Sequence, residues 1–221
     1  MIENLKRMAG HIDADYFDLR YETRRVEQVA MNKKEIRSFG TNTGDGYVLR
    51  VLKNGGFATV TFTKPEQAAT AIRKACENAA ILARNQKTPK QIAPAPVVRD
   101  TVKARLIQDP RKVSPEEKLQ LTRHYSELLF AQPKVANVEI GYADVYRNKF
   151  FINSEGSEIN EELVTTRIAG SVITQEGKLT QTVRVSFGGS NGFQKVLGRE
   201  AEAIDRAKIG ADLLKAEPVK G

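Results

Sequence analysis

Apolar and polar residues alternate along much of the first sixty positions, as they do in β-strands. Phe17, Leu19 and Tyr21 alternate with charged residues, which is the period-two pattern of a half-buried strand. A short helix is expected before it, over residues 2–9. Further strands are predicted over residues 26–31, 34–39, 46–53 and 57–62. The last two are separated by Asn54-Gly55-Gly56, which tolerates the positive φ of a tight turn and therefore predicts a β-hairpin.

Three longer segments follow the helical period instead. Their predicted ranges are residues 64–85, 115–130 and 198–216. Thr63 and Glu66 have the spacing of a capping box at the start of the first helix, and Ser114 and Glu117 repeat this spacing before the second. Alanines supply much of the apolar stripe of the first helix, so we expect it to pack closely on a sheet.

Residues 101–221 repeat the outline of residues 1–86, because strands are again followed by a helix. The strands of this second half are predicted over residues 137–147, 149–153, 162–174 and 179–187. Three prolines make residues 87–100 an extended linker. Antiparallel hairpins followed by helices predict the α+β class. We expect one domain over residues 1–221, with a two-layer antiparallel sheet, packed helices and two similar halves.

Charge adds a candidate binding surface to this picture. The chain has 221 residues and a net charge of +8. The possible basic partner patch consists of Arg20, Arg24, Arg25, Lys33, Lys34 and Arg37. Such a patch could bind an acidic partner or nucleic acid. Glu22, Glu27 and Glu35 lie among these cations, so a solvated strand face is the alternative. Basic and aromatic residues are not interleaved, and specific nucleic-acid binding is not expected.

The residues that could carry chemistry are few and far apart. The two histidines, His11 and His124, are far apart, and neither has another histidine three or four residues away as a helical zinc site requires. The single cysteine, Cys76, lies among alanines on a predicted helix, as a small buried hydrophobic residue would. We therefore predict no catalytic, metal-binding or cofactor-binding residue in this chain.

The distribution of apolar residues along the chain predicts the cellular location of the protein. No apolar run approaches the length of about 20 residues that spans a bilayer. Charged residues interrupt residues 1–8, which therefore lack the apolar core of a signal peptide. A cytoplasmic protein without membrane contact is expected.

Several short motifs occur in order along the whole chain. They are Asp18-Leu-Arg-Tyr-Glu22, Gly46-Tyr-Val-Leu-Arg-Val-Leu52, Gly55-Gly-Phe-Ala58, Asp109-Pro110 with Ser114-Pro-Glu-Glu-Lys-Leu119, Asn153-Ser-Glu-Gly156 and Gly192-Phe193. Their order and spacing resemble the amino-terminal half of the TldD/PmbA family of zinc metallopeptidases, formerly labelled modulators of DNA gyrase. The Asn153-Ser-Glu-Gly156 turn is more similar to the TldD branch than to the PmbA branch.

The resemblance implies a cytoplasmic hydrolase that degrades or matures peptides and unfolded proteins. Family members pair as homo- or heterodimers around an enclosed chamber. Their zinc is held by a helical His-Glu-x-x-x-His motif and a later cysteine in the carboxy-terminal half, and neither matches a position here. Zinc is thus expected in a full-length family protein, and this chain alone is expected to be inactive. Proline at position 218 should end the last helix, and we expect the parent reading frame to continue beyond Gly221 into the zinc-binding half.

These expectations combine into one hypothesis and two alternatives. The hypothesis is a non-catalytic domain that forms a wall of the chamber and supports dimerisation and peptide binding. A peptide strand added to a sheet edge would suit this role, because backbone hydrogen bonds accept many sequences. The alternatives are a stand-alone module that binds nucleic acid or a gyrase-like partner, and a structural subunit that complements a separate catalytic chain.

Overall fold

A computed structural model describes residues 1–217 of the chain. The expected helix stop at residue 218 lies outside the described residues. Within residues 1–217, no helix combines the length and the apolar character that a bilayer crossing requires.

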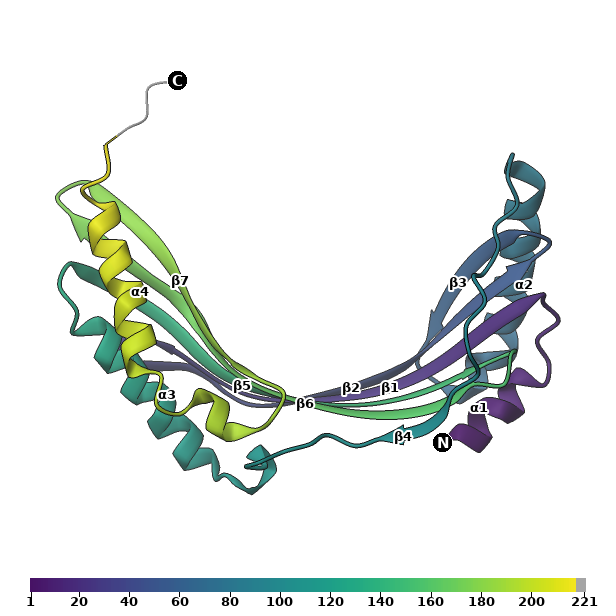
Figure 1. The fold of residues 1–221 in the computed structure, drawn as a ribbon, viewed down its shortest axis with the longest axis horizontal. Coiled ribbons are helices and arrows are strands. Elements are labelled where there is room, and N and C mark those ends of the chain that lie inside the picture. The colour runs from purple at the N-terminus through teal and green to yellow at the C-terminus, as the bar shows by residue number, and fades with distance from the viewer. Residues whose placement is uncertain (218–221) are drawn as a thin grey trace. The chain divides into compact units, whose positions relative to one another are not determined.

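Residues 1–217 form four α-helices and one mixed, mainly antiparallel sheet, which confirms the predicted α+β class (Figure 1). The helices are α1 (Ile2–Ala9), α2 (Ala68–Asn85), α3 (Pro115–Phe130) and α4 (Glu200–Leu213). The strands are β1 (Tyr16–Asn32), β2 (Glu35–Lys53), β3 (Gly56–Phe62), β4 (Arg99–Val102), β5 (Val135–Asn153), β6 (Glu158–Glu176) and β7 (Leu179–Gly189). Their order in the sheet is β3-β2-β1-β5-β6-β4, with β7 also paired to β6.

The strands are longer than their sequence pattern predicts. Predicted strands over 26–31 and around Leu19 are both parts of β1, and those over 34–39 and 46–53 are parts of β2. Likewise, β5 unites the two strands that were expected over 137–147 and 149–153. The residues between the predicted segments are polar or glycine-rich. These stretches stay extended because the neighbouring strands continue the backbone ladder beside them.

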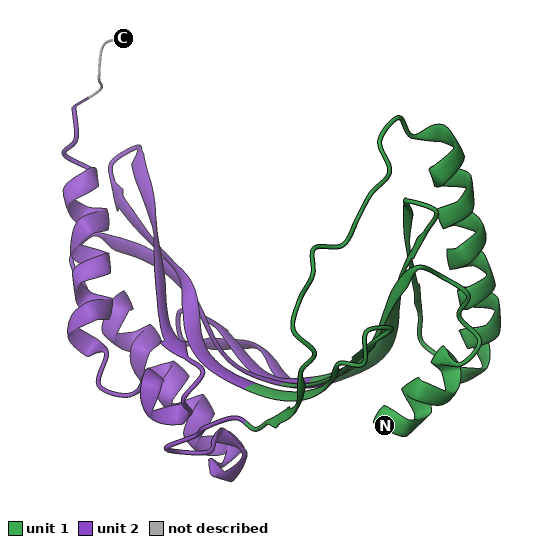
Figure 2. Cartoon of the chain, turned by 45° about the vertical axis from the view of Figure 1, so that its right-hand side comes forward, with its two compact units in different colours: residues 1–24, 43–103, 147–163 green, residues 25–42, 104–146, 164–221 purple. Residues whose placement is uncertain are grey.

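Contacts divide the chain into two compact units, each assembled from separate stretches (Figure 2). Unit 1 comprises residues 1–24, 43–103 and 147–163, and unit 2 comprises residues 25–42, 104–146 and 164–221. Each unit takes residues from both sides of the 87–100 segment, so the units are not the two sequence halves. The single-domain organisation stays a prediction. Residues 86–98 contain neither helix nor strand.

In unit 1, α2 packs on the β2–β3 hairpin. Alanines form most of the buried side of α2, so the helix backbone can approach the sheet closely. Asn54 and Gly55 have φ angles of 51° and 79°, which confirms the predicted hairpin turn. A Cβ atom on Gly56 would collide with the carbonyl oxygen of Ala79 in α2. Gly55 therefore serves the turn, and Gly56 permits the close contact with the helix.

In unit 2, α3 and α4 lie on one face of the sheet and contact each other (Figure 1). The centre of this core is the fully buried ring of Tyr125 in α3. Its hydroxyl donates to the carbonyl oxygen of Val196 at 2.8 Å and accepts from the amide of Arg199 at 3.0 Å. These two bonds fix the chain just before α4 begins.

The two predicted capping boxes have different outcomes. At α3, the amide of Glu117 donates to the Ser114 hydroxyl at 3.1 Å, and the box is confirmed. At α2, the prediction of Thr63 with Glu66 was wrong. The side-chain oxygen of Gln67 instead accepts from the amides of Thr63 and Lys64, at 3.1 and 3.0 Å. A 3₁₀ turn, η1 (Pro65–Gln67), precedes α2 and shifts the reaching side chain by one position.

Candidate functional site

The six cations of the predicted basic patch belong to both units. Arg20 and Arg24 lie in unit 1, whereas unit 2 contains Arg25, Lys33, Lys34 and Arg37. Three of these cations face a carboxylate on their own strand, in the pairs Arg20–Asp18 (3.2 Å), Arg25–Glu27 (2.5 Å) and Arg37–Glu35 (3.5 Å). The neighbouring carboxylates therefore offset part of the positive charge.

Within unit 2, the structure brings three of these cations together. Lys33 and Lys34 form the turn between β1 and β2, and Arg37 follows on β2. The Lys33 ammonium lies 5.2 Å from the centroid of the Phe130 ring, and its carbonyl oxygen accepts from the Ser126 hydroxyl at 2.5 Å. Helix α3 thus holds the turn in place, while Lys34 and Arg37 remain exposed.

The two histidines are in different units, His11 in unit 1 and His124 in unit 2. His124 is 3.2 Å from Glu200 at its Nε2 atom and is half exposed. No group of three His, Cys, Asp or Glu side chains that could hold a metal occurs in residues 1–217. The described residues therefore do not fit the zinc site of the family that the sequence resembles.

Cys76 and His11 line a hollow of about 630 Å³ between α1 and α2 in unit 1. The Cys76 thiol contacts the carbonyl oxygen of Asp13 at 3.7 Å. Lys53 donates to the same oxygen at 3.1 Å and to the Asp13 carboxylate at 2.7 Å. Burial raises the pKa of the Cys76 thiol, which keeps it protonated at neutral pH. The hollow is thus mainly apolar with a charged rim, and it does not activate the thiol.

A buried network of charges in unit 2 was not found from the sequence. Lys118 of α3 donates to Asp144 of β5 at 2.7 Å and to Glu27 of β1 at 2.6 Å. The Asp144 carboxylate is fully buried and also accepts from the hydroxyls of Tyr142 at 2.7 Å and Thr166 at 2.6 Å. We call this set the Asp144 network. Its residues come from α3, β1, β5 and β6, so it joins the helix to three strands.

Two tyrosines on β5 are affected by this network. Burial raises the pKa of Tyr142 well above its ordinary value, and the nearby Asp144 carboxylate adds to the effect. The same two causes, in the same order, raise the pKa of Tyr146. Both phenols therefore stay protonated as hydrogen-bond donors to Asp144. The alternation Tyr142-x-Asp144-x-Tyr146 was the available sequence signal, because period two places all three on one face of a strand.

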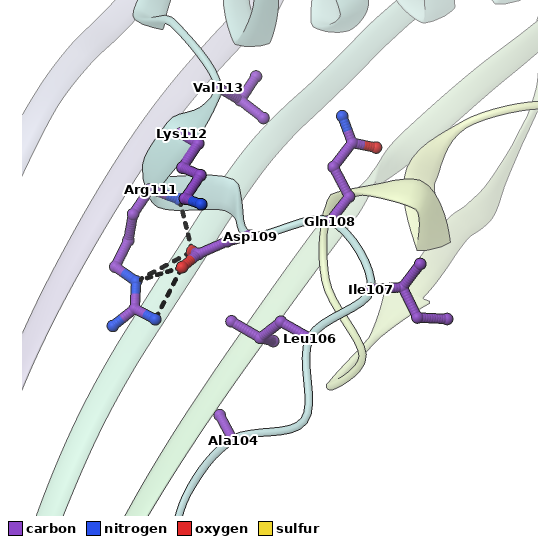
Figure 3. A pocket seen from close by; sticks show the side chains of 8 residues that line it. All are labelled: Ala104, Leu106, Ile107, Gln108, Asp109, Arg111, Lys112 and Val113. Carbon is purple, nitrogen blue, oxygen red and sulfur yellow. Dashed lines mark hydrogen bonds and ion pairs between the residues drawn. The ribbon is translucent and has the colours of Figure 1, made fainter.

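Immediately before α3, eight residues between Ala104 and Val113 line an open hollow of about 450 Å³ in unit 2 (Figure 3). Arg111 binds the Asp109 carboxylate through its Nε at 2.9 Å and Nη2 at 2.8 Å. This contact holds the pKa of Asp109 below its ordinary value. The side chain of Ile107 points away from the ion pair and is 80% exposed.

Hydrogen bonds to the loop before α4 hold this segment in place. The Ile107 amide donates to the Asn191 carbonyl at 2.9 Å, and the Phe193 amide donates to the Gln108 carbonyl at 2.8 Å. Gly192 has a φ of 114°, and any Cβ there would collide with the Gln108 carbonyl. The eight residues that line the hollow include no serine, cysteine or histidine. They can bind a group but offer no nucleophile with an adjacent base.

Two segments of this chain match the models of known protein domains. The model of the PmbA/TldA metallopeptidase domain 1 matches residues 17–83, and the model of the central domain of the same family matches residues 108–213. The second match includes α3, most of the Asp144 network and most of the residues that line the hollow in Figure 3.

Curated relatives and solved structures agree with these matches. A metalloprotease from Methanocaldococcus jannaschii is 28% identical over 97% of this chain and 48% of its own length. A metalloprotease from Methanothermobacter thermautotrophicus is 26% identical over 92% of this chain and 44% of its own.

Two solved structures share the fold. TldE from Thermococcus kodakarensis has a TM-score of 0.67 at 17% identity, over 94% of this chain and 47% of its own. A Thermotoga maritima protein named as a candidate modulator of a DNA gyrase has a TM-score of 0.70 at 14% identity, over 99% and 49%. The chain thus spans about half the length of the relatives it matches. Because its two matched segments are the first and central domains of one family, the chain belongs to the PmbA/TldD metallopeptidase family.

Proposed function

We propose that this chain is the non-catalytic amino-terminal portion of a cytoplasmic TldD/PmbA-type zinc metallopeptidase. It forms part of the wall of a peptide chamber and supports dimerisation and peptide binding. The observation that carries the proposal is the match of the family's first and central domains, in chain order, to a chain about half as long as its relatives. In a full-length enzyme, a zinc ion would supply the hydrolytic chemistry from outside these residues.

Exposed apolar residues support a docking role for unit 2. Leu179 of β7 and Ile209 and Leu213 of α4 are 59%, 41% and 41% exposed. Ile209 and Leu213 are four residues apart and therefore lie on one face of the helix. Apolar side chains grouped on a surface favour packing against another protein surface. We propose that the remaining portion of the metallopeptidase packs on these three residues.

The test measures metal, cleavage and binding on the purified chain. We expect no stoichiometric zinc by elemental analysis and no cleavage of a fluorogenic peptide mixture, together with measurable binding of a permanently unfolded polypeptide such as carboxymethylated lactalbumin. One tightly bound zinc per chain with chelator-sensitive cleavage would overturn the non-catalytic assignment. Failure to bind any unfolded polypeptide would remove the peptide-binding part.

A second candidate function rests on the net charge of +8. A stand-alone module for nucleic acid or a gyrase-like partner would use the cations at the β1–β2 turn. Binding that comes from phosphate neutralisation alone weakens steeply as salt rises. Selective binding of one DNA sequence at physiological salt would favour this alternative. In the third candidate function, this chain is a structural subunit that complements a separate catalytic chain. A second chain that carries the zinc site and restores peptide cleavage when the two are mixed would favour it.

A further inference from the structure

The part of β2 in unit 2, residues 35–42, has an unpaired edge. Strand β3 pairs with β2 only from Tyr47 to Lys53, and no other described strand adjoins β2 on that side. All eight residues from Glu35 to Asn42 are exposed. Their sequence has no proline, the residue that most simply blocks an edge. Backbone N–H and C=O groups on this side are therefore available to a further strand.

The free edge of β2 is long enough to pair with an added strand. Eight residues exceed the usual strand length of about five or six. Helix α3 fixes the start of the strand through the Ser126–Lys33 hydrogen bond, and the Lys33 amide donates to the Val138 carbonyl of β5 at 2.8 Å. A partner strand would add to a template that is already ordered, which lowers the entropic cost of binding.

The side chains along this edge of β2 favour a partner strand with acidic and apolar residues. Arg37 and Phe39 are two residues apart and lie on one face of β2, because side chains alternate along a strand. Phe39 is 53% exposed. The side chains of Arg37 and Glu35 are 61% and 74% exposed, so their ion pair is weak and Arg37 can exchange partners. Lys33, Lys34 and Arg37 against Glu35 leave a net positive charge at this edge.

We propose that the free β2 edge, Glu35–Asn42, binds an extended polypeptide segment that carries acidic side chains, by adding it to the sheet as a strand. This proposal rests on the proposed function and assigns the peptide-binding role of the domain to the β2 edge. An acidic residue of the segment lies beside Arg37, and an apolar residue two positions away lies beside Phe39. Opposite charges and apolar pairs across strands each stabilise a sheet. The backbone ladder supplies the rest of the affinity.

The probe is a fluorescein-labelled ten-residue peptide in which glutamate and valine take turns on one face of the strand and threonine fills the positions between them. Binding is followed by fluorescence anisotropy. A form N-methylated on alternate residues, which blocks one edge of the peptide, is expected to keep its affinity within about threefold, because the other edge still pairs. A form N-methylated on every residue is expected to bind at least tenfold more weakly. Equal binding of this fully methylated form would overturn strand addition.

Charge reversal on the protein tests the location. Arg37→Glu is expected to weaken binding of the glutamate peptide about tenfold and to strengthen binding of a peptide with lysine in its place. The matched control is Lys178→Glu, an exposed lysine in the β6–β7 turn of the same unit, which should change neither affinity. When the peptide is added, hydrogen exchange should show new protection within Ile36–Thr41 at those amides that point away from β1.

The outcomes separate this inference from the proposed function. If the peptide binds but Arg37→Glu has no effect and residues 36–41 gain no protection, the edge assignment is wrong and peptide binding by the domain stands. If neither the peptide nor an unfolded polypeptide binds, both the edge assignment and the peptide-binding role are wrong.

Discussion

At the scale of single residues, Asp144 depends on more partners than any other carboxylate described above. Lys118 provides its opposite charge, while Tyr142 and Thr166 donate hydroxyl hydrogen bonds. A buried ion pair contributes little compared with an apolar pair of the same size. Removing one partner is costly, because an uncompensated charge then stays buried.

We expect Asp144→Asn to lower the free energy of unfolding by about 1–3 kcal/mol, because Lys118 keeps Glu27 as a partner while the buried hydroxyls of Tyr142 and Thr166 lose a charged acceptor. Urea unfolding of the purified protein measures the change. Asp212→Asn is the matched control, since Asp212 pairs with Lys215 at 3.6 Å on the surface and both side chains are largely exposed. The control should stay within about 0.5 kcal/mol of the parent. Equal losses in both variants would show that Asp144 has no special role.

The raised pKa of Tyr142 predicts how the free energy of unfolding responds to alkaline pH. Its folded-state pKa is raised above the ordinary value of 10.0 by burial and by Asp144. The stabilisation from its neutral form is complete below the unfolded pKa and is lost as pH rises above it, because only the unfolded state then releases the proton. Tyr142→Phe should reduce the decline in unfolding free energy above pH 10 by up to about 1.4 kcal/mol per pH unit. Identical slopes for parent and variant between pH 10 and 11.5 would contradict the raised pKa.

At the scale of elements, helix starts can be read from the sequence only where the cap is local and regular. Ser114, Pro115 and Glu117 satisfy the start of α3 in the expected way. The start of α2 looked equivalent, but Pro65 opens a 3₁₀ turn and Gln67 takes the role assigned to Glu66. Both Thr63 and Glu66 match the motif, so spacing alone could not distinguish the two starts.

Paired substitutions test this difference. Ser114→Ala should cost about 1 kcal/mol of unfolding free energy, because the Glu117 amide loses its acceptor. Thr63→Ala should cost much less, since the Thr63 side chain does not cap the helix and its backbone amide keeps its bond to Gln67. Thermal and urea unfolding of both variants give the comparison. A loss at Thr63 as large as the loss at Ser114 would restore the original capping assignment.

Strand lengths show a second limit at this scale. Period-two patterning located the cores of β1, β2 and β5, yet it ended each of them at polar or glycine-rich positions. Gly40 and Gly44 stay within β2. A strand continues as long as its neighbour supplies hydrogen bonds, and that neighbour is chosen by the fold of distant residues.

At the scale of the whole molecule, the proposed docking residues Leu179, Ile209 and Leu213 predict self-association of the purified chain, because their apolar side chains are exposed. Leu213→Glu should weaken concentration-dependent association at least tenfold, because it places a charge in an apolar contact. Sedimentation velocity over a hundredfold concentration range measures it. Leu82→Glu on α2 is the control, since Leu82 is similarly exposed but belongs to unit 1. A parent chain that stays monomeric at the highest concentration would count against the docking surface.

The sequence by itself determined the class of the fold, most helix boundaries, the β2–β3 hairpin and the family resemblance. These features depend on neighbours within a few positions: the helical and strand periods, the caps and the glycines of a tight turn. The family motifs are also short and occur in chain order. The sequence also indicated that His11, His124 and Cys76 lack the spacing of a metal site.

Only the tertiary structure decided which distant residues meet. Lys118 and Glu27 are 91 positions apart, and Lys118 looked like an ordinary residue of the first turns of α3 until the sheet placed Asp144 beside it. The free edge of β2 also became visible only when β3 proved to pair with Tyr47–Lys53 alone. Local propensity specifies the kind of element, whereas pairing, burial and unpaired edges depend on where the whole chain brings each element.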